Sequence, residues 1–215
     1  MKEAVETAEE WLSKGDEKRT VVTPNPEIIW MAKNDPDFCD VLNNAGLRLA
    51  DGIGVVIASR MLKKPLPERV AGYDFLQELL KLGRKTFFFG GKPGVAESAA
   101  KGRGNVVGTH HGYFVEEESE DIIKKINDSG AEILVVCLGA PRQEKWIAQY
   151  REQLSPTIAI GAGGALDVMA GNVKRAPRWM QKCGLEWLYR ALSDPKRIGR
   201  LFAIPKFLWA VSRQK

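Results

Sequence analysis

Polar side chains directly follow several short β-type runs of this 215-residue chain, and one of them is a carboxylate. Asp51 comes after the run 47–50, and Gly52 and Gly54 leave its side chain uncrowded. A carboxylate at a strand end can take a proton from an attacking hydroxyl if the two groups come within about 2.6–3.2 Å. The same Asp could instead cap the helix expected to begin near Gly54. From these residues alone, both interpretations stay open.

A second polar loop, at Thr23 and Asn25, lies between prolines after the run 20–23. The prolines restrict the backbone, so both side chains are held in place to hydrogen-bond sugar hydroxyls or a phosphate. The alternative is an ordinary strand-to-helix turn, with Asn25 as the helix cap and Pro26 in the first turn. For Asn25 the two interpretations are compatible.

Three other patterns resemble cofactor motifs but lack an essential feature. Asp35 and Asp37 form a DxD pattern, which metal-dependent transferases use to hold Mg²⁺ or Mn²⁺, but the pattern opens a helix instead of ending a strand. The glycine-rich segment 161–166 has Leu where a dinucleotide fingerprint needs its third glycine. Gly91 and Lys92 are followed by Pro, so there is no P-loop. We therefore expect no metal site and no cofactor.

The arrangement of strand and helix signals predicts an α/β fold with a doubly wound, mostly parallel, Rossmann-like sheet. In such a sheet ligands bind beyond the carboxyl ends of the strands, where the polar loops lie. We assign residues 1–172 to this domain. The expected strands are 20–23, 47–50, 86–89, 105–108, 133–136 and 157–160. The expected helices are 3–13, 26–33, 36–44, 54–63, 73–83, 94–101, 119–128, 142–153 and 164–170.

The last part of the chain, residues 173–215, has a different composition. From residue 171 onward there are 11 Lys and Arg against 2 Asp and Glu, whereas residues 1–170 have 21 against 25. Trp and Leu alternate with these cations, which predicts two or three basic amphipathic helices suited to an anionic membrane surface. The alternative is that their apolar stripes pack on the domain. No apolar run reaches the roughly 18–20 residues that span a bilayer, so membrane contact would be peripheral.

Six motifs stand in order along the chain. They are 23–27 (TPNPE), 50–56 (ADGIGVV), 65–72 (PLPERVAG), 108–114 (GTHHGYF), 138–146 (LGAPRQEKW), and 173–177 (VKRAP) with 184–190 (GLEWLYR). Together they resemble the WecG/TagA/CpsF glycosyltransferase family. Members of this family usually have an additional first strand, and roughly ten more residues near Gly102 than this chain has.

The resemblance implies an inverting, metal-independent transfer of N-acetylmannosamine from UDP to the 4-hydroxyl of GlcNAc on undecaprenyl diphosphate. It implies that Asp51 is the catalytic base, that Thr23 is an active-site residue, and that Arg69 and Gln143 bind substrate. Asp167, after the loop 161–164, is placed to accept hydrogen bonds from the ribose of UDP; the alternative is a helix-surface acid. Relatives use other sugars, such as the uronic acid of N-acetylmannosamine, so the donor stays open. A non-enzymatic module that binds membrane or nucleic acid through its basic tail is the other alternative.

Without a metal, cationic side chains must meet the charge that develops on the UDP leaving group. Arg190, Arg197 and Arg200 stand at helical or near-helical spacing, and the resemblance implies that the appendage brings such arginines to the diphosphate. Their alternative is a face exposed to water or lipid headgroups. We expect a peripheral protein on the cytoplasmic side of a bacterial plasma membrane that binds no nucleic acid and keeps its three cysteines reduced. The resemblance implies that it can self-associate as a homo-oligomer.

Overall fold

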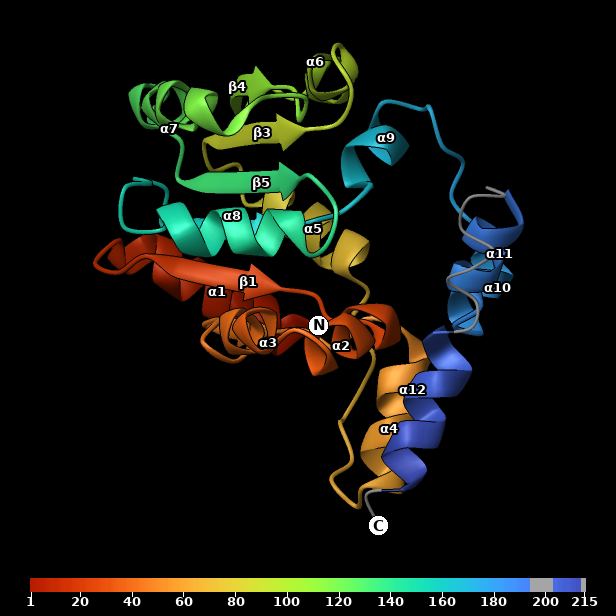
Figure 1. Cartoon of the computed structure of the whole chain (residues 1–215). Coiled ribbons are helices and arrows are strands. Elements are labelled where there is room, and N and C mark those ends of the chain that lie inside the picture. Colours follow the sequence, from red (N-terminus) through yellow and green to blue (C-terminus); the bar gives the residue numbers. More distant parts are fainter. Residues whose placement is uncertain (194–202, 214–215) are drawn as a thin grey trace.

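The computed structural model describes residues 1–193 and 203–213. Within these residues six strands form one sheet, in the order β2-β1-β6-β5-β3-β4, and every neighbouring pair is parallel. Figure 1 shows β1, β5, β3 and β4 in this order across the sheet. The strands are β1 (Arg19–Val22), β2 (Leu47–Arg48), β3 (Thr86–Gly90), β4 (Val106–His110), β5 (Ile133–Cys137) and β6 (Ile158–Gly161). The predicted α/β class with a parallel Rossmann-like sheet is confirmed.

Helices cover both faces of the sheet, because side chains of a strand point alternately to its two sides. Phe88, Val135 and Ile160 pack with α1, α5, α6 and α9, whereas Phe89 and Val136 pack with α7 and α8 on the other face. The helices up to α9 are α1 (Lys2–Lys14), α2 (Pro26–Lys33), α3 (Pro36–Asn43), α4 (Ile53–Met61), α5 (Gly72–Lys81), α6 (Val95–Ala100), α7 (Ser119–Asp128), α8 (Arg142–Tyr150) and α9 (Ala165–Met169).

The DxD pattern opens helix α3, as the sequence predicts. The carboxylate of Asp35 accepts a hydrogen bond of 3.0 Å from the amide of Phe38 and one of 2.6 Å from Lys145. The bond from Lys145, with help from the Phe38 amide, lowers the pKa of Asp35 below its ordinary value. Among the described residues, no three His, Cys, Asp or Glu side chains are grouped to hold a metal ion.

Three further helices follow the sheet domain: α10 (Arg178–Lys182), α11 (Glu186–Ser193) and α12 (Ala203–Ser212). Helix α12 lies along α4 and packs Phe207 and Val211 against Ala58, and the pair extends away from the sheet (Figure 1). Trp179 and Trp209 remain 61% and 57% exposed. The interpretation that an apolar stripe packs on the domain is therefore confirmed for α12. The two tryptophans face outward, and their contact with a membrane stays a prediction. Among the described helices none is long and apolar enough to cross a bilayer.

Glu144, in helix α8, is buried beside the end of β6, and this has a testable consequence. Burial raises the pKa of Glu144, while the side-chain amide of Gln143 donates to one oxygen of its carboxylate at 2.7 Å. Because the folded pKa is raised, protonation of Glu144 stabilises the fold at low pH, and this contribution is lost as pH rises through the folded pKa. In urea unfolding at about pH 4, below the ordinary pKa of Glu, and at about pH 7.5, wild type should therefore lose stability relative to Glu144→Gln at the higher pH. An equal difference at both pH values would contradict this.

Candidate active site

A pocket at the carboxyl ends of β1, β2 and β6 brings four predicted residues together. Thr23 and Asn25 come from the loop after β1, Asp51 from the segment after β2, and Arg69 from the loop before α5. Residues of the appendage contribute the remaining side of the pocket, which joins segments far apart in sequence. The other lining residues are Pro26, Glu27, Gly52, Ile53, Gly54, Ala71, Gly72, Tyr73, Ala162, Ala165, Gly184, Glu186, Trp187, Ala191 and Ile204.

Backbone hydrogen bonds fix the position of Asp51 beside the Thr23 loop. The amide of Asp51 donates to the carbonyl of Pro24 at 3.1 Å, and the amide of Val70 donates to Ala50 at 3.0 Å. Gly52 has a φ of 89°, which favours glycine and turns the chain into α4 immediately after the carboxylate. Asp51 is half-buried and lines the pocket.

Three helices begin at the wall of this pocket. The first residues of α2, α4 and α5, which have 8, 9 and 10 residues, all line it. The amino-terminal end of a helix carries a partial positive charge and donor amides, which can stabilise an anion such as a phosphate group, although Glu27, Asp51 and Glu186 also line this pocket. Asn25 caps α2 by accepting a 3.0 Å bond from the amide of Ile28, so the predicted cap role is confirmed. Its contact with substrate stays a prediction.

Thr23 is packed directly against the first residue of α5. A Cβ added at Gly72 would lie 2.9 Å from the Cβ of Thr23, closer than real carbon atoms approach. We expect Gly72→Ala to displace Thr23 and to lower kcat/KM by about 10-fold or more, because small displacements at a reacting centre are costly. Gly104→Ala is the matched control, since its Cβ would meet no atom within 4 Å. If steady-state kinetics give Gly72→Ala the same kcat/KM as wild type, catalysis does not depend on a fixed position of Thr23.

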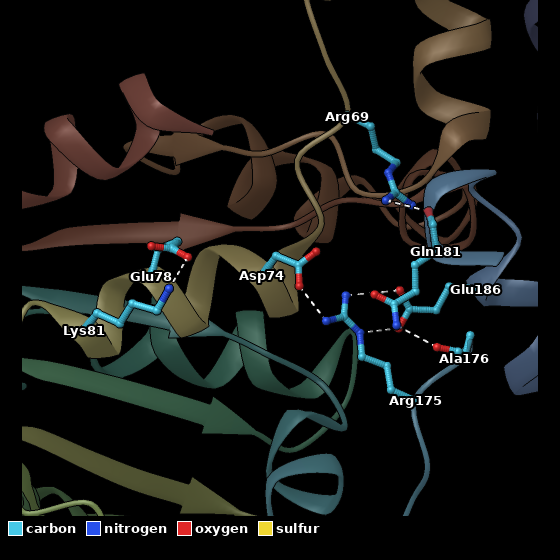
Figure 2. Close-up of polar contacts among 8 residues, drawn as sticks. All are labelled: Arg69, Asp74, Glu78, Lys81, Arg175, Ala176, Gln181 and Glu186. Carbon is cyan, nitrogen blue, oxygen red and sulfur yellow. Dashed lines mark hydrogen bonds and ion pairs between the residues drawn. The ribbon is translucent and has the colours of Figure 1, made fainter. Parts of the chain in front are cut away.

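The appendage lies directly on the Asp51 loop. A Cβ at Gly184 would come within 2.7 Å of the Cβ of Ile53, so only glycine permits this close approach. Arg69 donates a 3.0 Å hydrogen bond to the carbonyl of Gln181 at the end of α10 (Figure 2). Arg69 therefore lines the pocket and also ties the appendage to it. Its predicted contact with substrate stays a prediction.

Asp167 belongs to a second, neighbouring pocket over the ends of β5, β3 and β4. This pocket also carries Lys92 and Arg142, and the guanidinium of Arg142 lies 4.5 Å from the ring centre of Phe114. Helix α9 connects the two pockets, because Ala165 lines the first and Asp167 the second. A ligand that occupies both would extend along the carboxyl edge of the sheet.

Gln143 does not line either of these pockets. It is 2% exposed, and its Oε1 accepts bonds from the amides of Gly139 at 3.2 Å and Gly163 at 3.0 Å. It thereby joins the loops that follow β5 and β6. The structure shows this support of the loops, and the substrate contact predicted for Gln143 stays a prediction.

The predicted arginines of the appendage are less fully described. Arg190 lies in α11, but the description of the structure does not include its side chain, and Arg197 and Arg200 lie outside the described residues. Sequence reasoning missed several pocket residues, namely Tyr73, Glu186, Trp187 and Ile204. Two of them stand in the 184–190 motif, which was a usable signal. Nothing in the spacing of Tyr73 or Ile204 indicated a site.

His110 is the last residue of β4 and His111 follows it. Neighbouring side chains of an extended strand point to opposite faces, but His111 lies beyond the strand, and the two ring centres lie 4.7 Å apart. The Nδ1 of His110 lies 2.8 Å from the carbonyl oxygen of His111. Burial lowers the pKa of His110.

Comparison with known proteins shows the family to which the chain belongs. The family model described as "Glycosyl transferase WecG/TagA/CpsF family" matches residues 1–215. The chain belongs to this family and is a glycosyltransferase. Over 203 residues it is 38% identical to the N-acetylglucosaminyldiphosphoundecaprenol N-acetyl-beta-D-mannosaminyltransferases of Staphylococcus aureus strains MW2 and NCTC 8325 / PS 47. The matches cover 91% of this chain and 80% of each relative, and the protein of that name from strain MRSA252 is 37% identical over the same length.

Proposed function

We propose that this enzyme transfers N-acetylmannosamine, with inversion and without a metal, from UDP to the 4-hydroxyl of GlcNAc on undecaprenyl diphosphate. The observation that carries the proposal is the pocket in which Asp51 and Thr23 meet three helix amino termini under the appendage. The names of the relatives support the sugar and the acceptor. A lipid diphosphate acceptor of this kind belongs to the linkage unit of wall teichoic acid.

The proposed reaction is one displacement at the anomeric carbon of the donor. Asp51 takes the proton of the acceptor hydroxyl, the hydroxyl oxygen bonds to the anomeric carbon, and UDP leaves with the electron pair of the broken bond. The helix amino termini stabilise the charge that develops on the diphosphate, and we assign Arg190, Arg197 and Arg200 to the same task. We place the nucleoside toward Asp167, at the neighbouring pocket, where the carboxylate can accept hydrogen bonds from the ribose.

Metal independence is part of the proposal. The one DxD pattern considered for a metal has Asp35 engaged with the amide of Phe38 and with Lys145, as a helix cap requires. In this proposal the positive charge at the first pocket comes from the helix amino termini, from Arg69 and from the assigned appendage arginines, which would suit an anionic leaving group without a metal cation.

We also propose that the appendage contacts the anionic cytoplasmic face of the membrane, where the acceptor lipid resides. Exposed Trp179, Leu192 and Trp209 supply apolar side chains, and Lys206 and Arg213 supply charge near them in sequence. Such a combination fits a lipid interface, in which tryptophan lies at headgroup depth and cations meet anionic lipids.

The experiment that tests the function is a donor screen with a short-chain GlcNAc diphospholipid as acceptor. We expect transfer from UDP-N-acetylmannosamine, an α-to-β change of anomeric configuration by NMR, and equal rates with and without EDTA. Transfer from the uronic acid donor instead would assign the chain to the alternative specificity. No transfer from any UDP-sugar, or loss of activity in EDTA that Mn²⁺ restores, would contradict the proposed reaction.

A further inference from the structure

A cluster of ionic side chains beside the first pocket joins three segments of the chain. Arg175, in the segment between α9 and α10, lies 2.6 Å from Asp74 at the start of α5. Its Nε and one Nη atom also approach the two carboxylate oxygens of Glu186, at the start of α11, at 3.2 and 3.5 Å (Figure 2). One guanidinium thus connects the sheet domain with the appendage.

Two of the three side chains of the cluster are largely shielded from water. Arg175 and Glu186 are 19% and 14% exposed, whereas Asp74 is 43% exposed. Burial alone lowers the pKa of Arg175, but the bonds to Asp74 and Glu186 outweigh this and hold the pKa above its ordinary value. Planar guanidinium groups suit such simultaneous pairing, whereas the point charge of Lys does not reproduce it.

The location of the cluster connects it to the pocket without placing Arg175 on the pocket wall. The guanidinium lies 4.6 Å from the ring centre of Tyr73, and Tyr73, Glu186 and Trp187 all line the pocket. The hydrogen bond from Arg69 to Gln181 is a second tie between the same two parts (Figure 2). If the ionic tie is lost, α10 and α11 are held over Asp51 mainly by packing and by Arg69.

We propose that Arg175 is a positioning residue, which holds the appendage closed over the Asp51 pocket by pairing with Asp74 and Glu186 together. The proposal rests on the proposed function. A closed appendage keeps bulk water from the anomeric carbon while the acceptor hydroxyl is in place. In transfer to the acceptor and in hydrolysis by water alike, the bond from sugar to UDP breaks and UDP keeps the electron pair. The new bond forms to the acceptor oxygen in transfer and to a water oxygen in hydrolysis, and the nucleophile's proton passes to Asp51.

The test is the ratio of sugar transfer to donor hydrolysis in the full-length enzyme. We expect Arg175→Ala to lower kcat/KM for transfer by about 10-fold or more and to raise the hydrolysed share of the UDP-sugar, because the closed state is less populated. In both quantities Arg175→Lys should lie between wild type and Arg175→Ala, and Asp74→Asn should resemble Arg175→Ala. A double-mutant cycle between Asp74→Ala and Arg175→Ala should give strongly non-additive effects on kcat/KM.

Arg84→Ala is the matched control, because Arg84 forms a comparable pair with Glu132, at 3.1 Å, at the amino end of the sheet. Equal kcat/KM and equal transfer-to-hydrolysis ratios in wild type, Arg175→Ala and Asp74→Asn would overturn the proposal. So would the same loss in Arg84→Ala.

Hydrogen exchange of residues 178–193 separates this proposal from the proposed function. Exchange in this segment should increase in Arg175→Ala and less in Arg175→Lys, whatever the substrate proves to be. Unchanged hydrogen exchange in Arg175→Ala would refute the positioning role of Arg175 even if sugar transfer is confirmed. If Arg175→Ala fails to fold, Asp74→Asn and Arg175→Lys carry the same comparison.

Discussion

We expect the Asp51→Asn enzyme to have a kcat about 10²–10⁴-fold lower than wild type, while it still folds and still binds UDP. The Asn side chain has nearly the same shape, so the backbone bonds that position the loop are kept, but an amide cannot accept the proton of the acceptor hydroxyl. The proton must then pass directly to water. Steady-state kinetics with the GlcNAc diphospholipid, together with calorimetric titration of UDP, measure the two properties separately.

Asp37→Asn is the matched control for this substitution. Asp37 is an exposed acid in the first turn of α3, away from the pocket lining, so its loss should leave turnover within about 2-fold of wild type. Undiminished turnover in Asp51→Asn would remove Asp51 as the base. Loss of turnover together with loss of UDP binding would indicate that the loop had collapsed and would assign Asp51 a structural role.

Deletion of the chain beyond Lys174 is the second change with a large expected effect. The truncated protein lacks Arg175, Glu186 and Trp187, and with them one side of the pocket. We expect recovery with anionic vesicles to be abolished and kcat/KM to fall by about 100-fold or more, because the site is left open to water and lacks the appendage arginines. Vesicle co-sedimentation and transfer assays in detergent measure these losses.

The deletion also uncovers the face of α4 on which Phe207 and Val211 pack, so loss of solubility is a separate risk. The double variant Trp179→Ser and Trp209→Ser avoids it, because both side chains are already mostly exposed. This variant should lose vesicle binding and keep UDP binding. A truncated enzyme that is fully active, or a double variant that sediments with vesicles like wild type, would count against the assigned role of the appendage.

The sheet and its helices could be predicted from sequence because most strands contain a short β-branched or aromatic run and several helices begin with a readable signal. Asn25 and Asp35 are such signals, and their caps occur where the sequence places them. The sequence also indicated Thr23 and Asp51, since Thr23 directly follows β1 and Asp51 lies in the segment after β2. The carboxyl ends of neighbouring strands meet at one edge, and the structure indeed places these two side chains around one pocket.

Contacts between distant segments were beyond the reach of sequence periodicity. The pairing of Arg175 with Asp74 and Glu186 depends on how the appendage docks, and the charge of Arg175 looked like any other cation of the basic tail. Gln143 stands in a recognisable motif, but the motif does not reveal that its side chain turns inward to join two loops. Helical spacing likewise places Arg190 on a helix without showing what it approaches.

Hydrogen exchange with and without UDP-N-acetylmannosamine tests most directly whether one site is built from the strand-end loops and the appendage together. The predicted result is simultaneous protection of residues 23–29, 51–56, 69–75 and 184–191, with no change at the amino ends of the strands. Protection of the loops alone, with the segment 184–191 exchanging as in the free enzyme, would contradict the account.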